Sequence, residues 1–476
     1  MSSKQTEAIH HFSQQFAKNL GFSPTADQEL AIRALSEFLF VENQLNIFLL
    51  GGYAGTGKTS LIGALVRTLA KTGMKSVLMA PTGRAAKVMS SFSGKSASTV
   101  HRKIYSFGED TGGGYQFMPK ENKLKNGVFI VDEASMITAS ENPEKPSLLY
   151  DLIEYVYSAP GCKLIFVGDI GQLPPIGLDF SPALNKKYLL DELGFQTITS
   201  LLSEILRQES DSGILHLSAQ LRKFAPEIPA LFSNQLDVVR IDSMDLQDEI
   251  ESSFSAFGRE NVMIVCRSNK QANLYNRQIR NRIFWYEEEL NAGDTAMALS
   301  NNYFWLDEKS EAGFIANGQM MEIQKIAREE EKYGCRFADA VVRFPDYPEM
   351  PAVEIKILLD SLYVDSPSLS QEKLRDLYNA ITAAEYAGIA NKRERRAKMR
   401  LDPYFQAVQV KFGYAVTCNK AQGGQWDAVF VDPGYFTTEM WDRNYMRWLY
   451  TAITRAKKKL YLVNLSPAFG PAEDSE

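Results

Sequence analysis

Short apolar runs alternate with segments of helical spacing along the first half of the chain. The runs consist mainly of Ile, Leu, Val, Phe and Met and lie at 46–51, 76–80, 128–131 and 163–168. A continuous apolar run of this length is typical of a strand buried on both faces of a parallel sheet. Residues 60–70 instead carry apolar side chains at helical intervals. The pattern predicts an α/β unit with helices on both faces of its sheet.

The same alternation returns in the second half of the chain and predicts a second α/β unit. Its strands and helices are expected at 261–266, 268–284, 413–417, 427–431, 441–455 and 459–463. A chain of 476 residues is long enough for two such units and for further small domains.

Two stretches depart from this alternation and are predicted to be insertions. Residues 90–126 combine Gly, Ser, Lys and aromatic residues, which fits a small hairpin. Residues 290–405 begin with short strand-like alternation, as at 317–323, and continue into a charged helical part over 365–400. Residues 1–45 are expected to be helical, because capping residues precede an apolar helical pattern there.

Composition narrows the class of protein without naming it. The net charge of −6 gives no global sign of nucleic-acid binding, although a basic groove can exist on an acidic protein. The four cysteines are far apart and form no C-x-x-C pair, which argues against a disulfide framework or a zinc site. No apolar run approaches the roughly 18 residues of a membrane span, and the N-terminus lacks a signal-peptide core. We therefore expect a cytoplasmic protein that is neither secreted nor membrane-bound.

The segment Gly52–Thr59 matches the pattern G-x-x-x-x-G-K-[ST] between a predicted strand and a predicted helix. Main-chain N–H groups around Gly55, Thr56 and Gly57 can wrap a triphosphate, and the helix N-terminus adds positive potential. Lys58 can reach the β- and γ-phosphates, and Thr59 can hold Mg²⁺. The alternative is a Gly-rich turn before an ordinary helix. The complete pattern in its required context favours binding of ATP with Mg²⁺.

Two carboxylates, Asp132 and Glu133, follow the predicted strand at 128–131. Asp132 can hold Mg²⁺, and Glu133 can orient and deprotonate an attacking water. The alternative is a solvated acidic pair at a strand end. A phosphate loop in the same unit favours the catalytic interpretation.

A second α/β unit without a phosphate loop suggests a site shared between the two units, with a cation for the γ-phosphate supplied by the second. Arg207 and Arg455 are the candidates. Arginine suits this role because its planar fork stays charged and binds phosphate oxygens in pairs. Either residue could equally be a surface arginine on a helix.

The chain resembles the superfamily 1 helicases of the 5′→3′ RecD/Dda-like branch. The matching segments follow the family order over nearly the whole chain. They are Gln28, Gly52–Thr59, 80–87, 99–101, 132–135, 168–175, 206–208, 413–417 with 420–423, and 450–457.

The resemblance implies two RecA-like parallel-sheet domains with a small pin insertion and an SH3-like β insertion. The first RecA-like domain is expected to occupy residues 1–200 and to contain the pin at 90–126. The second RecA-like domain is expected at 201–290 and 406–476. The SH3-like insertion with its helical extension is expected to occupy 291–405, between these two parts.

The resemblance also implies roles at the nucleotide. Gln28 would read the adenine, Gln172 would sense the γ-phosphate, and Gly424 would lie near the nucleotide. Arg207 and Arg455 would be the arginines supplied from the second domain. Lys58 and Glu133 would complete the catalytic set.

Residues that would bind single-stranded DNA come from both domains. They are Thr82, Arg84, Thr99, His101, Phe107, Thr417, Lys420 and Gln422. Hydroxyl, amide and imidazole groups suit contacts to a strand backbone, which need no base identity. The alternatives remain open: helix caps or strand ends for Thr82 and Thr417, a structural histidine for His101, and hairpin packing for Phe107.

Two positions limit the transfer of family roles. Asn419 and Gln425 stand where the family often has other residues, so strand contacts at those two positions are in doubt. The basic run 392–400 could touch phosphates or could be a solvated helix face.

The resemblance implies an ATP-dependent helicase of bacterial or phage type that moves 5′→3′ on single-stranded DNA, acts at duplex junctions and is monomeric. Three alternatives stay open. They are an RNA helicase or ribonucleoprotein remodeller, the motor subunit of a RecBCD-like nuclease complex, and a nucleotide-gated switch without helicase activity.

Overall fold

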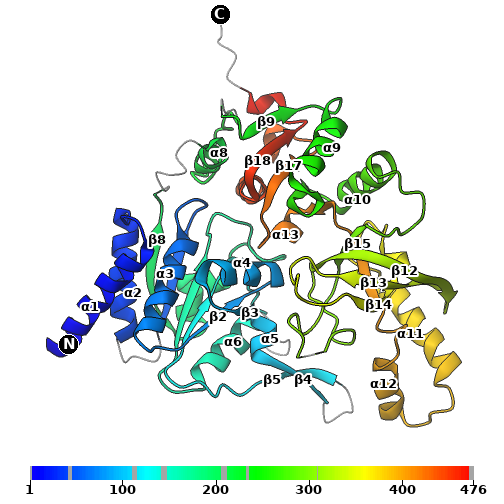
Figure 1. The fold of residues 1–476 in the computed structure, drawn as a ribbon, viewed down its shortest axis with the longest axis horizontal. Helices are drawn as coiled ribbons and strands as arrows, with labels where there is room; N and C mark the ends of the chain where they lie inside the picture. The colour runs from blue at the N-terminus through cyan, green and yellow to red at the C-terminus, as the bar shows by residue number, and fades with distance from the viewer. Residues whose placement is uncertain are drawn as a thin grey trace, which may run out of the picture.

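The computed structural model describes residues 3–40, 46–109, 115–140, 147–204, 212–231, 235–307 and 309–470, with main chain only at 107–109 and 115–117. Figure 1 shows two α/β units side by side, with a small barrel against both. Within the described ranges, none of the helices has the length and apolar character that crossing a bilayer demands.

The first unit is built on a six-stranded sheet in which every neighbouring pair is parallel. Its strands, in spatial order, are β3 (Ala97–Thr99), β2 (Ser76–Ala80), β6 (Val128–Val131), β7 (Lys163–Gly168), β1 (Asn46–Gly52) and β8 (Gln196–Leu202). The apolar runs at 46–51, 76–80, 128–131 and 163–168 are thus the central strands. Because side chains alternate along a strand, Phe48 and Leu50 face one layer of helices, and Ile47 and Leu49 face the other.

Helices cover both faces of this sheet. One core contains side chains of α1 (Ser3–Leu20), α2 (Ala26–Phe40), α3 (Lys58–Lys71) and α4 (Gly83–Ser93). The opposite core contains side chains of α5 (Val100–Ile104), α6 (Leu148–Tyr157) and α7 (Lys186–Asp191). This is the layering predicted from the apolar pattern.

The second unit has a five-stranded parallel sheet. Its strands, in spatial order, are β16 (Ala415–Thr417), β10 (Val262–Cys266), β17 (Trp426–Asp432), β18 (Ala456–Val463) and β9 (Val238–Ile241). Its helices are α8 (Gly213–Leu221), α9 (Leu246–Phe257), α10 (Asn269–Gln278), α13 (Cys418–Ala421) and α14 (Arg443–Ile453). The α/β fold class with two parallel sheets is confirmed.

The larger insertion forms a closed barrel followed by two helices, α11 (Gln371–Glu385) and α12 (Lys392–Arg400). The barrel strands are β11 (Thr295–Ala298), β12 (Met320–Lys332), β13 (Cys335–Arg343), β14 (Val353–Leu358) and β15 (Val408–Phe412). The boundary expected after residue 405 is therefore wrong, because β15 closes the barrel against β11 and β14. The apolar run of β15 continues almost directly into β16, so periodicity alone does not reveal where the barrel ends.

The hairpin insertion is shorter than the expected 90–126. It consists of β4 (Tyr105–Glu109) and β5 (Tyr115–Pro119), which pair antiparallel. The residues before it belong to the first unit, since β3 extends the main sheet beside β2. Phe107 lies in β4, and its side chain is outside the described residues.

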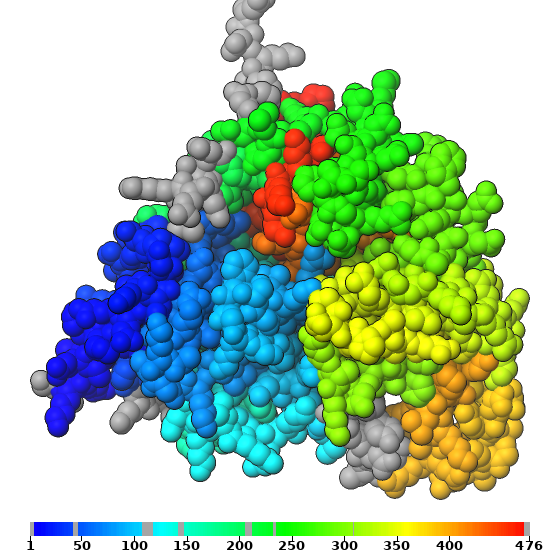
Figure 2. Space-filling model, in the orientation of Figure 1, coloured from blue at the N-terminus to red at the C-terminus, as the bar shows by residue number. Residues whose placement is uncertain are grey.

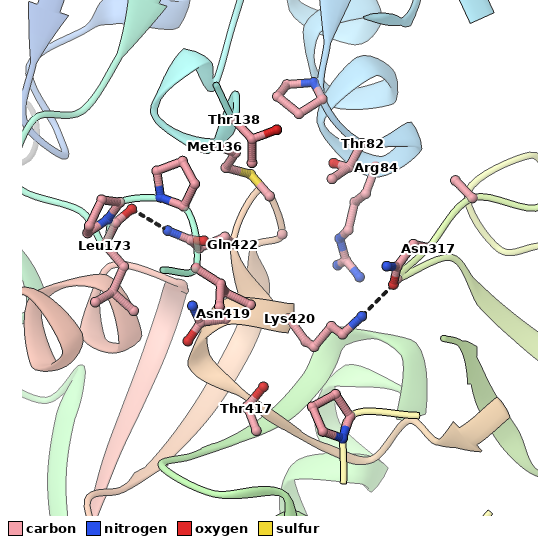
Figure 3. Close-up of a pocket in the computed structure, with 18 of the residues that line it drawn as sticks. Thr82, Arg84, Met136, Thr138, Leu173, Asn317, Thr417, Asn419, Lys420 and Gln422 are labelled. Carbon is pink, nitrogen blue, oxygen red and sulfur yellow. Dashed lines mark hydrogen bonds between the residues drawn. The ribbon is translucent and has the colours of Figure 1, made fainter. Parts of the chain in front are cut away.

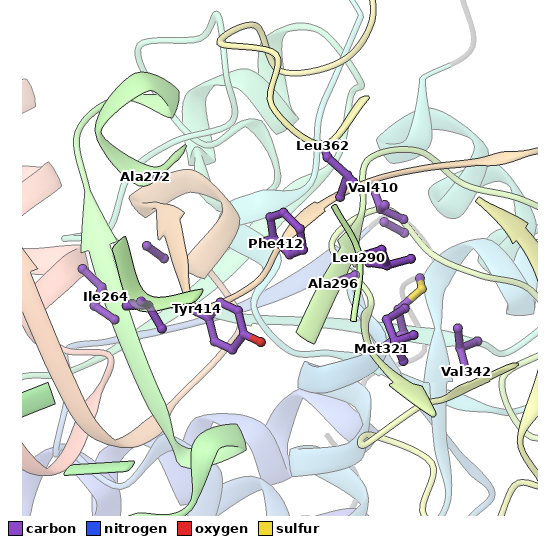
Figure 4. Close-up of a cluster of buried hydrophobic side chains, with 14 of the residues drawn as sticks. Ile264, Ala272, Leu290, Ala296, Met321, Val342, Leu362, Val410, Phe412 and Tyr414 are labelled. Carbon is purple, nitrogen blue, oxygen red and sulfur yellow. The ribbon is translucent and has the colours of Figure 1, made fainter. Parts of the chain in front are cut away.

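The barrel and the second unit share one hydrophobic core (Figure 4). Phe412 of β15 and Met321 of β12 belong to the same buried cluster as Ile264 of β10. A buried ion pair reinforces the junction, because Arg280 Nε donates to Asp294 Oδ1 at 2.9 Å. Breaking a buried pair by removing one partner costs about 3–5 kcal/mol. The barrel is therefore attached firmly to the second unit.

The barrel contacts the first unit through hydrogen bonds to main-chain oxygens and one close backbone approach. Lys87 of α4 donates to the main-chain oxygen of Pro345 at 2.9 Å, and Arg102 of α5 donates to that of Ser310 at 2.8 Å. Gly83 makes a close approach, since a Cβ there would lie 2.6 Å from the Tyr347 hydroxyl. Figure 2 shows the light-blue surface of the first unit meeting the barrel surface on this face.

Candidate functional site

The phosphate loop joins β1 to α3, as the motif predicts. Gly57 adopts a left-handed conformation (φ 80°) at the N-terminus of α3, and Gly55 does the same with φ 73°. Gly52 has no room for a side chain, because a Cβ would lie 2.9 Å from Lys58 Cγ. Lys58 Nζ donates to the main-chain oxygens of Gly52 and Tyr53, both at 2.8 Å. The lysine thus lies across the loop, where it can exchange these carbonyls for phosphate oxygens.

Gln28 supports this loop from α2. Its side chain is fully buried, its Nε2 donates to the main-chain oxygen of Thr56 at 3.2 Å, and its Oε1 accepts from Thr25 N at 3.1 Å. Thr25 Oγ1 in turn accepts from Gln28 N, which completes a capping box at the start of α2. Both ends of the Gln28 amide therefore have protein partners, and its role as an adenine reader stays a prediction.

Asp132 and Glu133 follow β6 at the carboxyl edge of the sheet. Glu133 is held in a left-handed conformation (φ 50°) that non-glycine residues seldom adopt. Its N–H donates to Asp132 Oδ1 at 2.8 Å. Burial, and then the neighbouring Glu133 carboxylate, raise the pKa of Asp132 to about 6. Strain at an acidic pair beside a phosphate loop is characteristic of functional sites.

The residues fit a magnesium ion bound together with a triphosphate. Thr59 lies in the first turn of α3, directly after the phosphate-loop lysine, and Asp132 offers the carboxylate. Within the described ranges, no three His, Cys, Asp or Glu residues form a metal-binding group. A hydroxyl and one carboxylate suit Mg²⁺, which keeps several waters and takes its remaining ligands from phosphate oxygens.

Gln172 follows β7 of the first unit, and Arg455 lies between α14 and β18 of the second unit. Gln172 is 5% exposed, and its Oε1 has no hydrogen-bond partner among the described residues. Arg455 is 2% exposed and donates to the main-chain oxygens of Thr451 and Gly424 at 2.9 and 3.2 Å. Its guanidinium thus points at its own unit. Arg207 lies outside the described residues.

Tyr450 of α14 also contacts the phosphate loop, although sequence patterns give it no role. Its hydroxyl accepts from Ala54 N at 2.9 Å and donates to Asp169 Oδ2 at 2.7 Å. Its ring stands edge-on to that of Tyr53, with centroids 6.5 Å apart. In the sequence, Tyr450 is distinguished only as the first residue of the family segment 450–457.

A cavity of about 1030 Å³ runs between the first unit, the second unit and the barrel (Figure 3). Seven of the predicted site residues line it, namely Thr82, Arg84, His101, Thr417, Lys420, Gln422 and Gly424. Gly424, expected near the nucleotide, therefore lies in this cavity wall. Thr99 is not in the wall and caps α5 by accepting from Arg102 N at 3.2 Å. We call this cavity the strand groove.

The groove residues are held by contacts between units. Gln422 Nε2 donates to the main-chain oxygen of Leu173 at 2.7 Å, and Lys420 donates to Asn317 Oδ1 of the barrel (Figure 3). Arg84 donates to the main-chain oxygen of Gln425 at 2.7 Å and stacks 4.1 Å over the Trp426 ring. These partners position the polar groups before any ligand binds.

Electrostatics in the groove are mixed. Burial lowers the pKa of His101, which favours the neutral imidazole, and burial also lowers the pKa of Lys420. The groove is also lined by basic and amide side chains that belong to none of the sequence motifs. These are Arg267, Asn269, Lys270 and Asn317.

Comparison with known proteins finds a matching family for part of each unit. Residues 38–178 match a family described as AAA domain, and residues 412–463 match one described as UvrD-like helicase C-terminal domain. The chain is 30% identical over 199 residues to the ATP-dependent RecD2 DNA helicase of Deinococcus radiodurans, covering 41% of this chain and 24% of the relative. It is 32% identical over 147 residues to the ATP-dependent DNA helicase dda of phage T4, covering 29% and 30%. Both domain matches and both relatives make the chain similar to the superfamily 1 helicases of the RecD/Dda-like branch.

These matches span less than a third of the length of either relative. Among solved structures, Pif1 helicase from Bacteroides in complex with ADP-AlF3 and ssDNA superposes with a TM-score of 0.48 at 15% identity, over 95% of both chains.

The departures from the family pattern at Asn419 and Gln425 differ in their consequence for the groove contacts. Gln425 meets Arg84 through its main-chain oxygen, so the side chain at that position is not needed for the contact. Asn419 lines the strand groove with its neighbour Lys420.

Proposed function

We propose that the chain is an ATP-dependent DNA helicase that moves 5′→3′ along single-stranded DNA and opens duplex ahead of it. The proposal is carried by one observation: the segment 168–173 touches both sites. Asp169 accepts a hydrogen bond from Tyr450, whose hydroxyl also contacts Ala54 of the phosphate loop. Leu173 lines the strand groove. Hydrolysis and strand binding therefore share a short piece of main chain.

Within this proposal, each predicted residue has a task at the nucleotide. Lys58 and the main-chain N–H groups of 55–59 would bind phosphate oxygens, while Thr59 and Asp132 would hold Mg²⁺. Mg²⁺, when bound, neutralises phosphate charge. Glu133 accepts the proton of the attacking water.

Closure of the two units would complete the site. Arg455 would exchange its bonds to Gly424 and Thr451 for γ-phosphate oxygens, together with Arg207. Gln172 would respond to the γ-phosphate with its amide. Such domain closure is a common way to link hydrolysis to movement.

The DNA strand would lie in the groove, and its phosphates would meet Lys420, Arg84 and the added cations Arg267 and Lys270. Support for DNA as the substrate comes from the relatives RecD2 and dda, which are both ATP-dependent DNA helicases. The 5′→3′ direction is inferred from the family branch, and the β4–β5 hairpin is proposed as the wedge.

An unwinding assay tests substrate and direction together. Duplexes of one sequence with a 5′ tail, a 3′ tail or blunt ends are offered with ATP and Mg²⁺, next to the same tails made of RNA. We expect opening of the 5′-tailed DNA and little of the other substrates. Preferential opening of the 3′-tailed duplex would overturn the direction, and equal opening on RNA tails would favour the RNA-helicase alternative.

Hydrolysis is expected to fall in mild acid because of Asp132. Its pKa of about 6 means that below this pH the carboxyl is protonated and offers Mg²⁺ no charged oxygen. The kcat/KM for ATP should therefore decline as the pH drops from about 7 to about 5. Since proton and metal compete for one carboxylate, tenfold more Mg²⁺ should move the acid limb to lower pH. An acid limb that ignores the Mg²⁺ concentration would contradict this assignment.

A further inference from the structure

The Tyr450 hydroxyl is placed between three parts of the proposed motor. It belongs to α14 of the second unit, yet both of its hydrogen-bond partners, Ala54 and Asp169, belong to the first. The side chain is fully buried. Burial, with the Asp169 carboxylate next, raises the Tyr450 pKa well above its usual 10, so the hydroxyl keeps its proton and stays a donor.

The surrounding sequence makes room for this tyrosine. A Cβ at Gly171 would lie 3.1 Å from Tyr450 Cε1 and 3.2 Å from Asp169 Oδ1. Gly171 N also donates to Asp169 Oδ1 at 2.9 Å, which fixes the carboxylate that accepts from Tyr450. On the other side, Arg222 of the second unit lies 4.8 Å over the Tyr53 ring. The phosphate loop is thus contacted by two side chains of the second unit.

The next residue of α14 continues the connection to the strand groove. Thr451 Oγ1 accepts from Leu173 N at 2.9 Å. The oxygen of the same residue, Leu173, accepts from Gln422, whose side chain lines the groove. One helical turn therefore touches the phosphate loop through Tyr450 and the groove wall through Thr451.

We propose that Tyr450 is a positioning residue whose hydroxyl couples occupancy of the strand groove to the conformation of the phosphate loop. The inference rests on the proposed function, because it assigns a route between that function's two sites. A strand that moves Gln422 shifts Leu173 and hence α14, and Tyr450 transmits the shift to Ala54 and Asp169. By reciprocity, a nucleotide at the phosphate loop alters strand affinity by the same factor.

The coupling can be measured without catalysis. We define the coupling ratio as the Kd for a fluorescent thymidine oligonucleotide without AMP-PNP divided by that with saturating Mg²⁺ and AMP-PNP. Tyr450→Phe removes only the hydroxyl. The ratio is expected to move at least threefold toward 1, and by reciprocity the change in AMP-PNP affinity caused by the oligonucleotide should shrink by the same factor. Stimulation of kcat by the oligonucleotide should fall in parallel.

Tyr445→Phe is the matched control. Tyr445 lies on the same helix and is also buried, and its hydroxyl has no hydrogen-bond partner among the described residues. This variant should keep the wild-type ratio. Thr451→Val tests the route, since its effect and that of Tyr450→Phe should be less than additive in the double variant.

The outcomes separate the inference from the proposed function. A wild-type ratio near 1, with no stimulation of hydrolysis by DNA, would overturn the proposed function and this inference with it. A coupled wild type with an unchanged ratio in Tyr450→Phe would overturn the inference alone. So would a variant that loses kcat equally with and without DNA, because a structural or chemical role predicts that result.

Discussion

Glu133→Gln is expected to lower DNA-stimulated ATP hydrolysis by roughly 10²–10⁴-fold, the usual contribution of a positioned general base. Glutamine has the same shape, so the left-handed backbone at this position and the hydrogen bond from its N–H to Asp132 persist. What is lost is the carboxylate that accepts a proton from water. The affinity for ATP should change little, because this carboxylate binds no phosphate.

Single-turnover hydrolysis and equilibrium binding of a fluorescent ATP analogue separate these two effects. Glu154→Gln is the matched control, since it makes the same change on an exposed position of α6 in the same unit. If Glu133→Gln retained more than about a tenth of the wild-type rate, Glu133 would not be the base.

Lys58→Ala is expected to lower both ATP affinity and hydrolysis, with a combined loss in kcat/KM of at least about 10³-fold. Charge-assisted hydrogen bonds contribute about 1.5–3 kcal/mol each, and the ammonium can offer more than one to the phosphates. In the structure the same group makes two bonds of 2.8 Å to loop carbonyls. The variant therefore loses a phosphate ligand and a brace of the loop.

Lys71→Ala provides the control on the same helix. Lys71 lies 13 residues further along α3, about 20 Å at 1.5 Å per residue, and its Nζ donates to Asn19 Oδ1. Thermal unfolding should show that both variants fold. A Lys58→Ala protein with wild-type kcat/KM would refute the phosphate assignment, whereas equal losses in both variants would indicate a defect of α3 as a whole.

The sequence pattern within one short segment is enough to predict the elements that form the phosphate loop. The strand, loop and helix from Asn46 to Lys71 follow one another in sequence, and their glycines are required by backbone geometry within the same loop. Asp132 and Glu133 were predictable for the same reason, since they directly follow a buried strand. Buried parallel strands give long apolar runs that periodicity detects well.

Contacts across the chain could not be predicted in this way. Ala54 and Tyr450 are 396 positions apart, and no spacing rule relates them. The end of the barrel at Phe412 was missed because β15 and β16 form nearly one apolar run. Arg84 is predicted to bind DNA, and the structure shows that it also joins the units through Gln425 and Trp426, which no local pattern indicates.

Three basic side chains of the first unit donate hydrogen bonds to main-chain oxygens of the barrel and of the second unit. Lys87, Arg102 and Arg84 donate to the carbonyls of Pro345, Ser310 and Gln425, respectively. A carbonyl is present whatever residue occupies the position, because every residue carries the same acceptor. Substitutions in the loops that carry these carbonyls therefore leave the hydrogen bonds intact, provided that the backbone conformation does not change. We expect evolutionary drift to concentrate in those loops and selection to act on the three basic donors.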